Sequence, residues 1–228
     1  RLIMHRLRLD WEPLALLSKM LKISEMSAHK VDVYTVETTE EETTERTTLP
    51  ESLALPIDLL IEDFKIGEVA IYTSDSIDVH DDRQPTNIFS NISLRVDSNS
   101  KSHQIKHLAV DSEFGSVAAS GQISTARPFD LNTQLKLDSS KWGITKASLT
   151  GDLKKIAIDL EHRHRDSYGT VQAQLHPYAE KQMVSALKIV MNQLNIADYS
   201  KDTIQTNLSF QATLNENNAG QLVGNLTL

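Results

Sequence analysis

The chain has 228 residues, no cysteine, 39% hydrophobic and 5% aromatic residues, and a formal net charge of −8 at pH 7. The lack of cysteine excludes disulfide scaffolds, thiolate metal sites and cysteine nucleophiles, and the acidic balance disfavours nucleic-acid binding, which needs clustered Lys and Arg. No run of about 18 apolar residues is present, so the sequence predicts no membrane-spanning helix, and we expect the chain to be a segment of a longer protein.

Residues 1–36 read as strand, short helix and strand. The stretch from Pro13 to Leu21 carries further leucines at positions 14, 16 and 17. This spacing favours a short amphipathic helix with proline in its first turn. We therefore predict one short helix here, between strands that begin the sheet.

Residues 37–52 are acidic and rich in threonine. Between 37 and 51, six glutamates stand against one arginine, a local charge of −5 that leaves −3 for the other 213 residues. No aliphatic residue occurs before Leu49, so the stretch cannot bury enough apolar surface to offset the entropy of ordering it. We predict a solvated, flexible loop, with docking of a basic partner as the alternative.

Residues 53–228 alternate between apolar and polar side chains with a period of two. The runs that carry the pattern are Ile57–Leu59–Ile61, Ile92–Leu94–Val96, Leu108–Val110, Leu131 to Leu137, Ile156 to Leu160, Val171 to Leu175, Leu187–Ile189–Met191, Leu208 to Leu214 and Leu222 to Leu228. Such alternation is typical of a sheet with one apolar and one polar face. The sequence thus predicts an all-β protein whose region 53–228 is built of repeated strands.

A weak repeat is also visible. Gly115, Gly169 and Gly220 each open a G-x-[V/L]-x-[A/G] pattern, at separations of 54 and 51 residues. Repetition near 50 residues favours stacked units that share one core. The segment from Tyr178 to Leu187 breaks the alternation, and we predict a second short helix there.

Motifs for catalysis are not found. Neither G-x-S-x-G nor S-x-x-K in a supporting context is present, and the glycine-rich loops that cradle phosphates are absent. We therefore expect no enzymatic activity and no cofactor.

Two groups of residues are candidates for metal binding. His162 and His164 form an H-x-H pair, which on a strand projects both imidazoles from one face, but no third ligand is obvious. Asp78, His80 and Asp82 also alternate, although the sequence after them is typical of a turn. We predict no metal site, with a metal-dependent envelope enzyme that uses the two histidines as a remote alternative.

The apolar face is almost wholly aliphatic, and two interpretations of it are open. It is either the plain core of a sandwich or barrel, or one face of a bent sheet that stays partly open and holds acyl chains. Each buried methylene contributes about 0.8 kcal/mol, so a lipid tail needs no specific polar contact. From alternation alone, the packed core is the simpler interpretation.

Three stretches of sequence favour the open face. They are Leu7 to Ile23 with Lys30 to Val33, Leu53 to Leu59 with Phe64 to Ile71, and Gly121 to Ile123 leading to Pro128, Phe129 and Leu131. Their order and texture resemble the TamB family of AsmA-like, bridge-forming lipid transport proteins of the diderm bacterial envelope, in its membrane-proximal N-terminal part. They are similar to that family's strand–helix–strand start, its leucine-proline strand element and its glycine strand followed by Pro-Phe.

The resemblance implies an elongated, curved, antiparallel-rich sheet folded into a U-shaped groove (a β-taco) in the periplasm, within an inner-membrane-anchored protein. Such a groove carries phospholipid between the two membranes and supports outer-membrane biogenesis. The family's N-terminal inner-membrane anchor, and the C-terminal segment through which it meets its outer-membrane barrel partner, have no counterpart in this sequence. The alternative is a closed β-sandwich or adhesin-like binding module.

The resemblance and the alternation together select the side chains expected to line the groove by contact with acyl chains. They are Ile57, Leu59, Ile61, Leu94, Val96, Val117, Leu131, Leu135, Leu137, Ile156, Ile158, Leu160, Val171, Ala173, Leu175, Leu187, Ile189, Met191, Leu208, Phe210, Leu214, Leu222 and Leu226. The polar residues between them are expected to face solvent.

Overall fold

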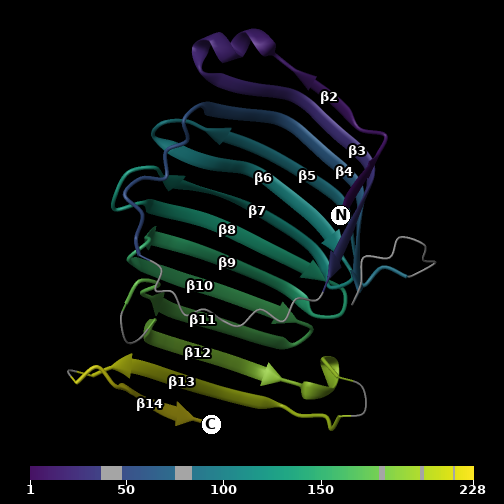
Figure 1. Ribbon diagram of the computed structural model, residues 1–228. Helices are drawn as coiled ribbons and strands as arrows, with labels where there is room; N and C mark the ends of the chain where they lie inside the picture. Colours follow the sequence, from purple (N-terminus) through teal and green to yellow (C-terminus); the bar gives the residue numbers. More distant parts are fainter. Residues whose placement is uncertain (37–47, 75–83, 180–182, 201–202, 218) are drawn as a thin grey trace.

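The computed structural model describes residues 1–36, 48–74, 84–179, 183–200, 203–217 and 219–228, and in it the chain forms one large, open, curled sheet (Figure 1). The strands are β1 (Leu2–His5), β2 (Arg8–Trp11), β3 (Met20–Val36), β4 (Asp58–Ser74), β5 (Asn87–Ser98), β6 (Ser102–Ser112), β7 (Gly115–Ser124), β8 (Asp130–Ser139), β9 (Gly143–Asp152), β10 (Lys155–His164), β11 (Ser167–Leu175), β12 (Val184–Leu194), β13 (Leu208–Glu216) and β14 (Leu222–Thr227). The predicted all-β, elongated architecture is confirmed.

From β3 onward, neighbours in the sheet are neighbours in sequence. β1 and β2 both pair with β3, and β3 to β14 then follow one another in order. Every pairing is antiparallel except that of β3 with β4, which is parallel. Tight turns make the hairpins possible, and Gly143 shows why glycine is needed in one of them: its φ is +81°, and a Cβ at this position would collide with the carbonyl of Arg163.

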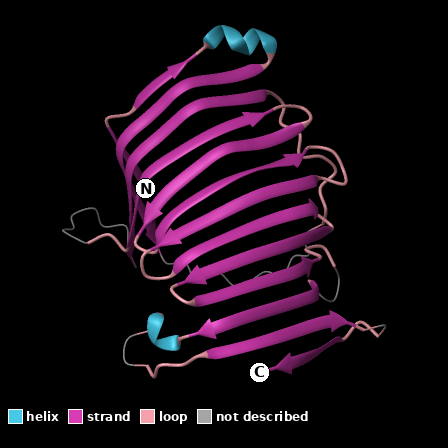
Figure 2. Ribbon diagram, turned by 180° about the vertical axis from the view of Figure 1, so that it is seen from behind, coloured by secondary structure: helices cyan, strands magenta, loops and turns pink. Residues whose placement is uncertain are grey.

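Irregularities in register bend the strands. Shifts occur between Ile61 and Phe64, between Ser90 and Ser93, and between Ile105 and Leu108, among others. Asn91, which lies inside one of these shifts, has a φ of +51°. Bulges of this kind kink a strand and increase its local twist, and Figure 2 shows the long strands β3 to β6 bending along their length.

The first predicted helix is present but shorter than expected. The 3-10 helix η1 spans Pro13–Ser18, and Lys19 ends it in the left-handed conformation with φ +56°. Met20 and Leu21, which were predicted as helical, already belong to β3. β3 is 17 residues long and pairs on both sides, so it outweighs the six-residue, leucine-rich segment before it.

The second predicted helix is wrong over Val184 to Leu187, because these residues begin β12. The cause is pairing: Leu187 lies opposite Ala173 of β11 and Leu214 of β13, so two strand partners outweigh a weak helical pattern. A short 3-10 helix, η2 (Ile196–Asp198), instead follows β12. Neither of the two helices in the described part of the chain has the length and apolarity to cross a membrane.

The predicted repeat holds only in part. Its first two copies fall on β7 and β11, which run in the same direction because four antiparallel steps separate them. Its third copy falls on β14, three steps from β11, and therefore runs in the opposite direction. The shared glycine pattern marks similar strands rather than three equivalent structural units.

The sheet is a single layer with very little interior. Among the described residues, the buried apolar side chains are Ala28, Val31, Ala70, Phe129 and Ile156. The chain of 25.5 kDa exposes 15788 Å², whereas a compact protein of this mass exposes about 10,000 Å². The closed β-sandwich alternative is therefore incorrect, because the described strands form one open sheet and not two packed ones.

Candidate functional site

One uninterrupted row of apolar side chains crosses the sheet from β2 to β14. Each member lies directly opposite the next on the neighbouring strand, and we call the set the central aliphatic row. It consists of Leu9, Met26, Phe64, Leu94, Leu108, Ala119, Leu135, Ala147, Leu160, Val171, Ile189, Ala212 and Leu226. With neighbouring strands about 4.8 Å apart, the row is roughly 60 Å long.

A second row runs beside it and is almost as apolar. Its members are Trp11, Ile23, Ile61, Val96, Ile105, Gly121, Thr133, Leu149, Ile158, Ala173, Leu187, Leu214 and Gly224. Thr133 is its one hydroxyl-bearing member. The two rows lie on the same side of the sheet, which we call the aliphatic face.

The register places all the predicted lining residues on the aliphatic face except Ile57. Leu131, Leu137 and Val117, for example, alternate with members of the two rows along β8 and β7. Ile57 precedes β4 and is 38% exposed in the connection that leads to it.

Sequence reasoning missed the contribution of β3 and of the second half of β4. Phe64 lies opposite Leu94, and Val69 lies opposite Phe89, so both join the aliphatic face. Simple alternation from Ile61 would exclude Phe64, and alternation continued from Phe64 would exclude Val69. The apolar residues of β4 are spaced 59, 61, 64, 66, 69 and 71. A spacing that alternates between two and three residues is the signal of a bulged strand, and it was available in the sequence.

The aliphatic face is sheltered but not covered. Along β7, Val117, Ala119 and Gly121 are half-buried, whereas Ala118 and Ser120 between them are exposed. Leu135, in the middle of the central aliphatic row, remains 38% exposed, and Leu226 at its end 64%. The face therefore offers apolar surface to water over most of its length.

Because β3 and β4 are parallel, the chain must run back from the end of β3 to the level of its start before β4 begins. Residues 37–47, most of the predicted acidic loop, lie outside the described residues. The described end is fixed to the turn after β7: the backbone N–H of Leu53 donates to the carbonyl of Thr125 (2.9 Å), and the Arg127 guanidinium donates to the carbonyls of Pro50 (3.0 Å) and Leu49 (3.1 Å). This end therefore lies beside the ends of the strands (Figure 1).

The two candidate metal ligands, His162 and His164, lie on the aliphatic face at the C-terminal end of β10. The Nδ1 of His162 lies 2.9 Å from the hydroxyl of Thr145, and its Nε2 lies 3.0 Å from the hydroxyl of Tyr199, which follows η2. The His164 ring packs against the Tyr199 ring with centroids 5.1 Å apart. Both imidazoles are thus engaged by the segment after β12.

No group of three or more potential metal ligands exists among the described residues. Asp78, His80 and Asp82 lie outside them. His164 is buried, with 7% of the residue exposed, and its Nε2 has no hydrogen-bond partner. Burial, followed by the charge of His164, holds the pKa of His162 below its ordinary value of 6.5, and burial raises the pKa of Tyr199. These shifts describe a packed edge rather than a built metal site.

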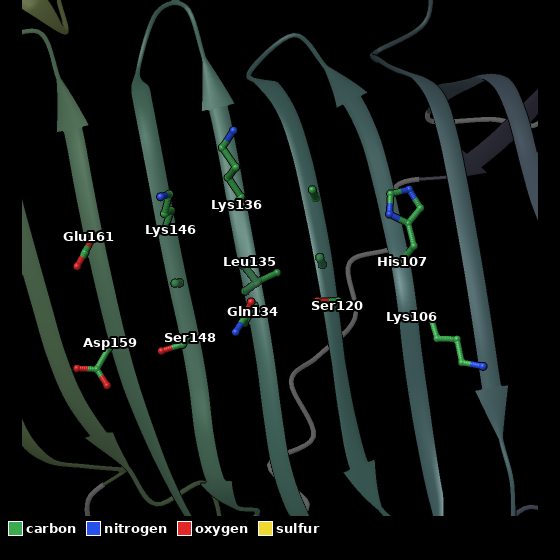
Figure 3. A pocket seen from close by; sticks show the side chains of 13 residues that line it. Lys106, His107, Ser120, Gln134, Leu135, Lys136, Lys146, Ser148, Asp159 and Glu161 are labelled. Carbon is green, nitrogen blue, oxygen red and sulfur yellow. The ribbon is translucent and has the colours of Figure 1, made fainter.

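The opposite, polar face carries a shallow depression of about 630 Å³ over β6 to β10. Lys136, Lys146 and Glu161 lie opposite one another in one row of it, and Figure 3 shows them side by side on neighbouring strands. Lys136 is paired with Asp138 (2.9 Å) and Lys106 with Asp97 (2.7 Å). Mutually paired charges of this kind are typical of a solvated surface.

Comparisons with known proteins identify no relative. A scan of family models, a search of curated proteins and a search of solved structures each gave no match. The class of fold, one open curled β-sheet with an aliphatic face, is thus defined by the structure itself. The resemblance to the TamB family remains an expectation from the sequence.

Proposed function

We propose that this chain is a segment of a periplasmic conduit, which carries phospholipid between the inner and outer membranes along its aliphatic face and so supports outer-membrane assembly. The observation that carries the proposal is the central aliphatic row, which is unbroken from Leu9 to Leu226 and lies on a single-layered sheet. A protein core would have been covered by a second layer. The resemblance to the TamB family supports the same function.

The chemistry of the row suits a mobile apolar ligand. Its large members alternate in places with alanines, since Leu135 stands between Ala119 and Ala147. The alanines leave shallow depressions in which an acyl chain can lie, and each methylene buried there contributes about 0.8 kcal/mol. Because the row offers no hydrogen-bonding group, moving a chain along it exchanges one apolar contact for another of similar strength.

The polar face supports the proposal in a different way. Its charges are paired, within a strand in Lys65 with Asp63 (2.7 Å) and across strands in Lys30 with Glu68 (3.1 Å), so this side of the sheet is solvated. Only one side of the sheet is then available to lipid. We assign neither the membrane anchor nor the barrel partner implied by the resemblance to residues of this chain.

Native mass spectrometry of the purified chain, with extraction of any bound lipid, tests the proposal. We expect adducts of phospholipid mass that disappear when Leu135 is replaced by glutamate but persist when the neighbouring Gln134, on the polar face, receives the same replacement. A chain purified from cells without any phospholipid, or with lipid that both variants retain equally, would overturn it.

A further inference from the structure

The helix η1 presents two leucines to water side by side. Leu14 is 79% exposed and Leu17 85%. Because a 3-10 helix has three residues per turn, side chains at i and i+3 lie on the same side. Figures 1 and 2 show η1 projecting beyond β2 at one end of the stack of strands. The molecule therefore has an apolar tip.

The tip is held firmly in place. The N–H of Glu12 donates to the carbonyl of Lys22 (3.0 Å), and the N–H of Asp58 donates to the carbonyl of Lys19 (2.9 Å). The Lys22 ammonium also donates to the Glu12 carboxylate at 2.5 Å. These bonds fix η1 at both ends to the start of β3 and β4, so its leucines cannot fold back onto the sheet.

The charge around the tip has the opposite sign to that of the rest of the chain. Residues 1–22 hold five bases and two acids, a balance of +3, which leaves 18 bases and 29 acids, or −11, for residues 23–228. Arg6 and Lys19, both exposed, stand on either side of the β2–η1 segment. Lys22 is shared between Glu12 and Glu62, and Arg8 is paired with Glu25, so Arg6 and Lys19 are the better placed for a further anionic partner.

The tip is continuous with the aliphatic face. Leu9 and Trp11, 51% and 37% exposed, lie opposite Met26 and Ile23 and begin the two apolar rows. Projecting leucines, an adjacent tryptophan and flanking bases are the combination with which a protein surface enters the headgroup region of an anionic bilayer.

We propose that the tip formed by β2 and η1 inserts Leu14 and Leu17 into the surface of an anionic phospholipid bilayer, with Arg6 and Lys19 on the headgroups. The aliphatic face then opens at the membrane surface. This placement complements the proposed function, but the binding of the tip to a membrane does not depend on lipid in the groove.

Flotation of the whole chain with vesicles tests the proposal. We compare vesicles of phosphatidylcholine with vesicles that also contain 30% phosphatidylglycerol. We expect binding to the anionic vesicles that weakens with salt, and a loss of about 100-fold for the variant with both Leu14→Ser and Leu17→Ser, as the transfer energy of two leucines predicts. Replacing Arg6 and Lys19 by asparagine, which tolerates their left-handed backbone, should remove the preference for anionic vesicles.

Ile204→Ser is the matched control, because Ile204 is 78% exposed but lies outside the tip, and it should bind as the original chain does. Equal binding by the double leucine variant would overturn the proposal, as would self-association that the variant abolishes, since the tip would then be an interface between copies. Native mass spectrometry of the same samples separates the two proposals. A chain that carries lipid adducts but does not float with vesicles would contradict only the proposal about the tip. A chain that floats but carries no adducts would contradict only the proposed conduit.

Discussion

Replacing Leu135 by glutamate should weaken lipid binding by about 100-fold while the chain still folds. Leu135 lies in the central aliphatic row between Ala119 and Ala147, and it is already 38% exposed. Burial of a whole leucine side chain is worth about 1.5–3 kcal/mol, so the loss of its partial burial costs about 1–2 kcal/mol of folding stability. The two small neighbours leave room for the new side chain.

The effect on lipid is larger. A hydrated carboxylate in the row would keep an acyl chain from about three or four methylenes of contact, or roughly 3 kcal/mol, which corresponds to a loss of about 100-fold in affinity. Gln134→Glu puts the same charge one residue away on the polar face, and we expect a change of less than about twofold.

The assay is titration of the delipidated chain and both variants with a phospholipid that carries a fluorescent acyl chain, with circular dichroism to confirm that each variant is folded. Ala173→Glu, in the neighbouring row, serves as an independent repeat of the experiment. Similar affinities for Leu135→Glu and Gln134→Glu would refute the assignment of faces, whatever the affinity of the original chain.

Three further predictions concern the fold. Small-angle scattering should give a radius of gyration clearly above the value of about 17 Å expected for a compact chain of this length, and a value near 17 Å would contradict an open sheet. Phe129→Ala should lower the free energy of unfolding by about 3–5 kcal/mol, because Phe129 is fully buried. Phe114 is 55% exposed, and Phe114→Ala should lower it by less than about 1 kcal/mol. Equal losses in the two variants would contradict the burial of Phe129. The depressed pKa of His162 means that the unfolded chain binds a proton which the folded chain resists, so its contribution to stability is complete above pH 6.5 and declines as the pH falls below that value. Thermal unfolding between pH 7 and 5 should show this loss, and His162→Gln should reduce it. An unchanged slope in His162→Gln would assign the loss to other groups.

Alternation sufficed to predict most of the aliphatic face. From Leu131 onward the strands are 6 to 11 residues long and regular over most of their length, so a period of two in the sequence is also a period of two in space. Leu135, Leu160 and Val171 are members of the central row that could be identified in this way. The openness of the sheet could not be predicted from alternation, because a covered and an uncovered face show the same pattern.

The long strands were harder to predict. β3 and β4 are 17 residues each, and bulges change which residues face the same side part of the way along them, so Phe64 and Val69 follow Ile61 on one face. The His162–His164 contacts with Tyr199 depend on the turn after β12, which brings together residues 37 and 35 positions apart. Local pattern holds no information about such a return of the chain.

The arrangement of the aliphatic face in rows bears on how it could work. If the face were a set of independent binding sites, a charge at one position would remove one site and leave the rest. In a conduit the members of the central row act in series, so a charge at Leu94 or at Ile189 should stop passage as completely as one at Leu135, although these residues lie on β5, β12 and β8. Each of these charges would then stop transfer along the sheet, even at lipid concentrations high enough to restore equilibrium occupancy. The difference between those two measurements, more than the affinity itself, distinguishes a path for lipid from a surface that merely holds it.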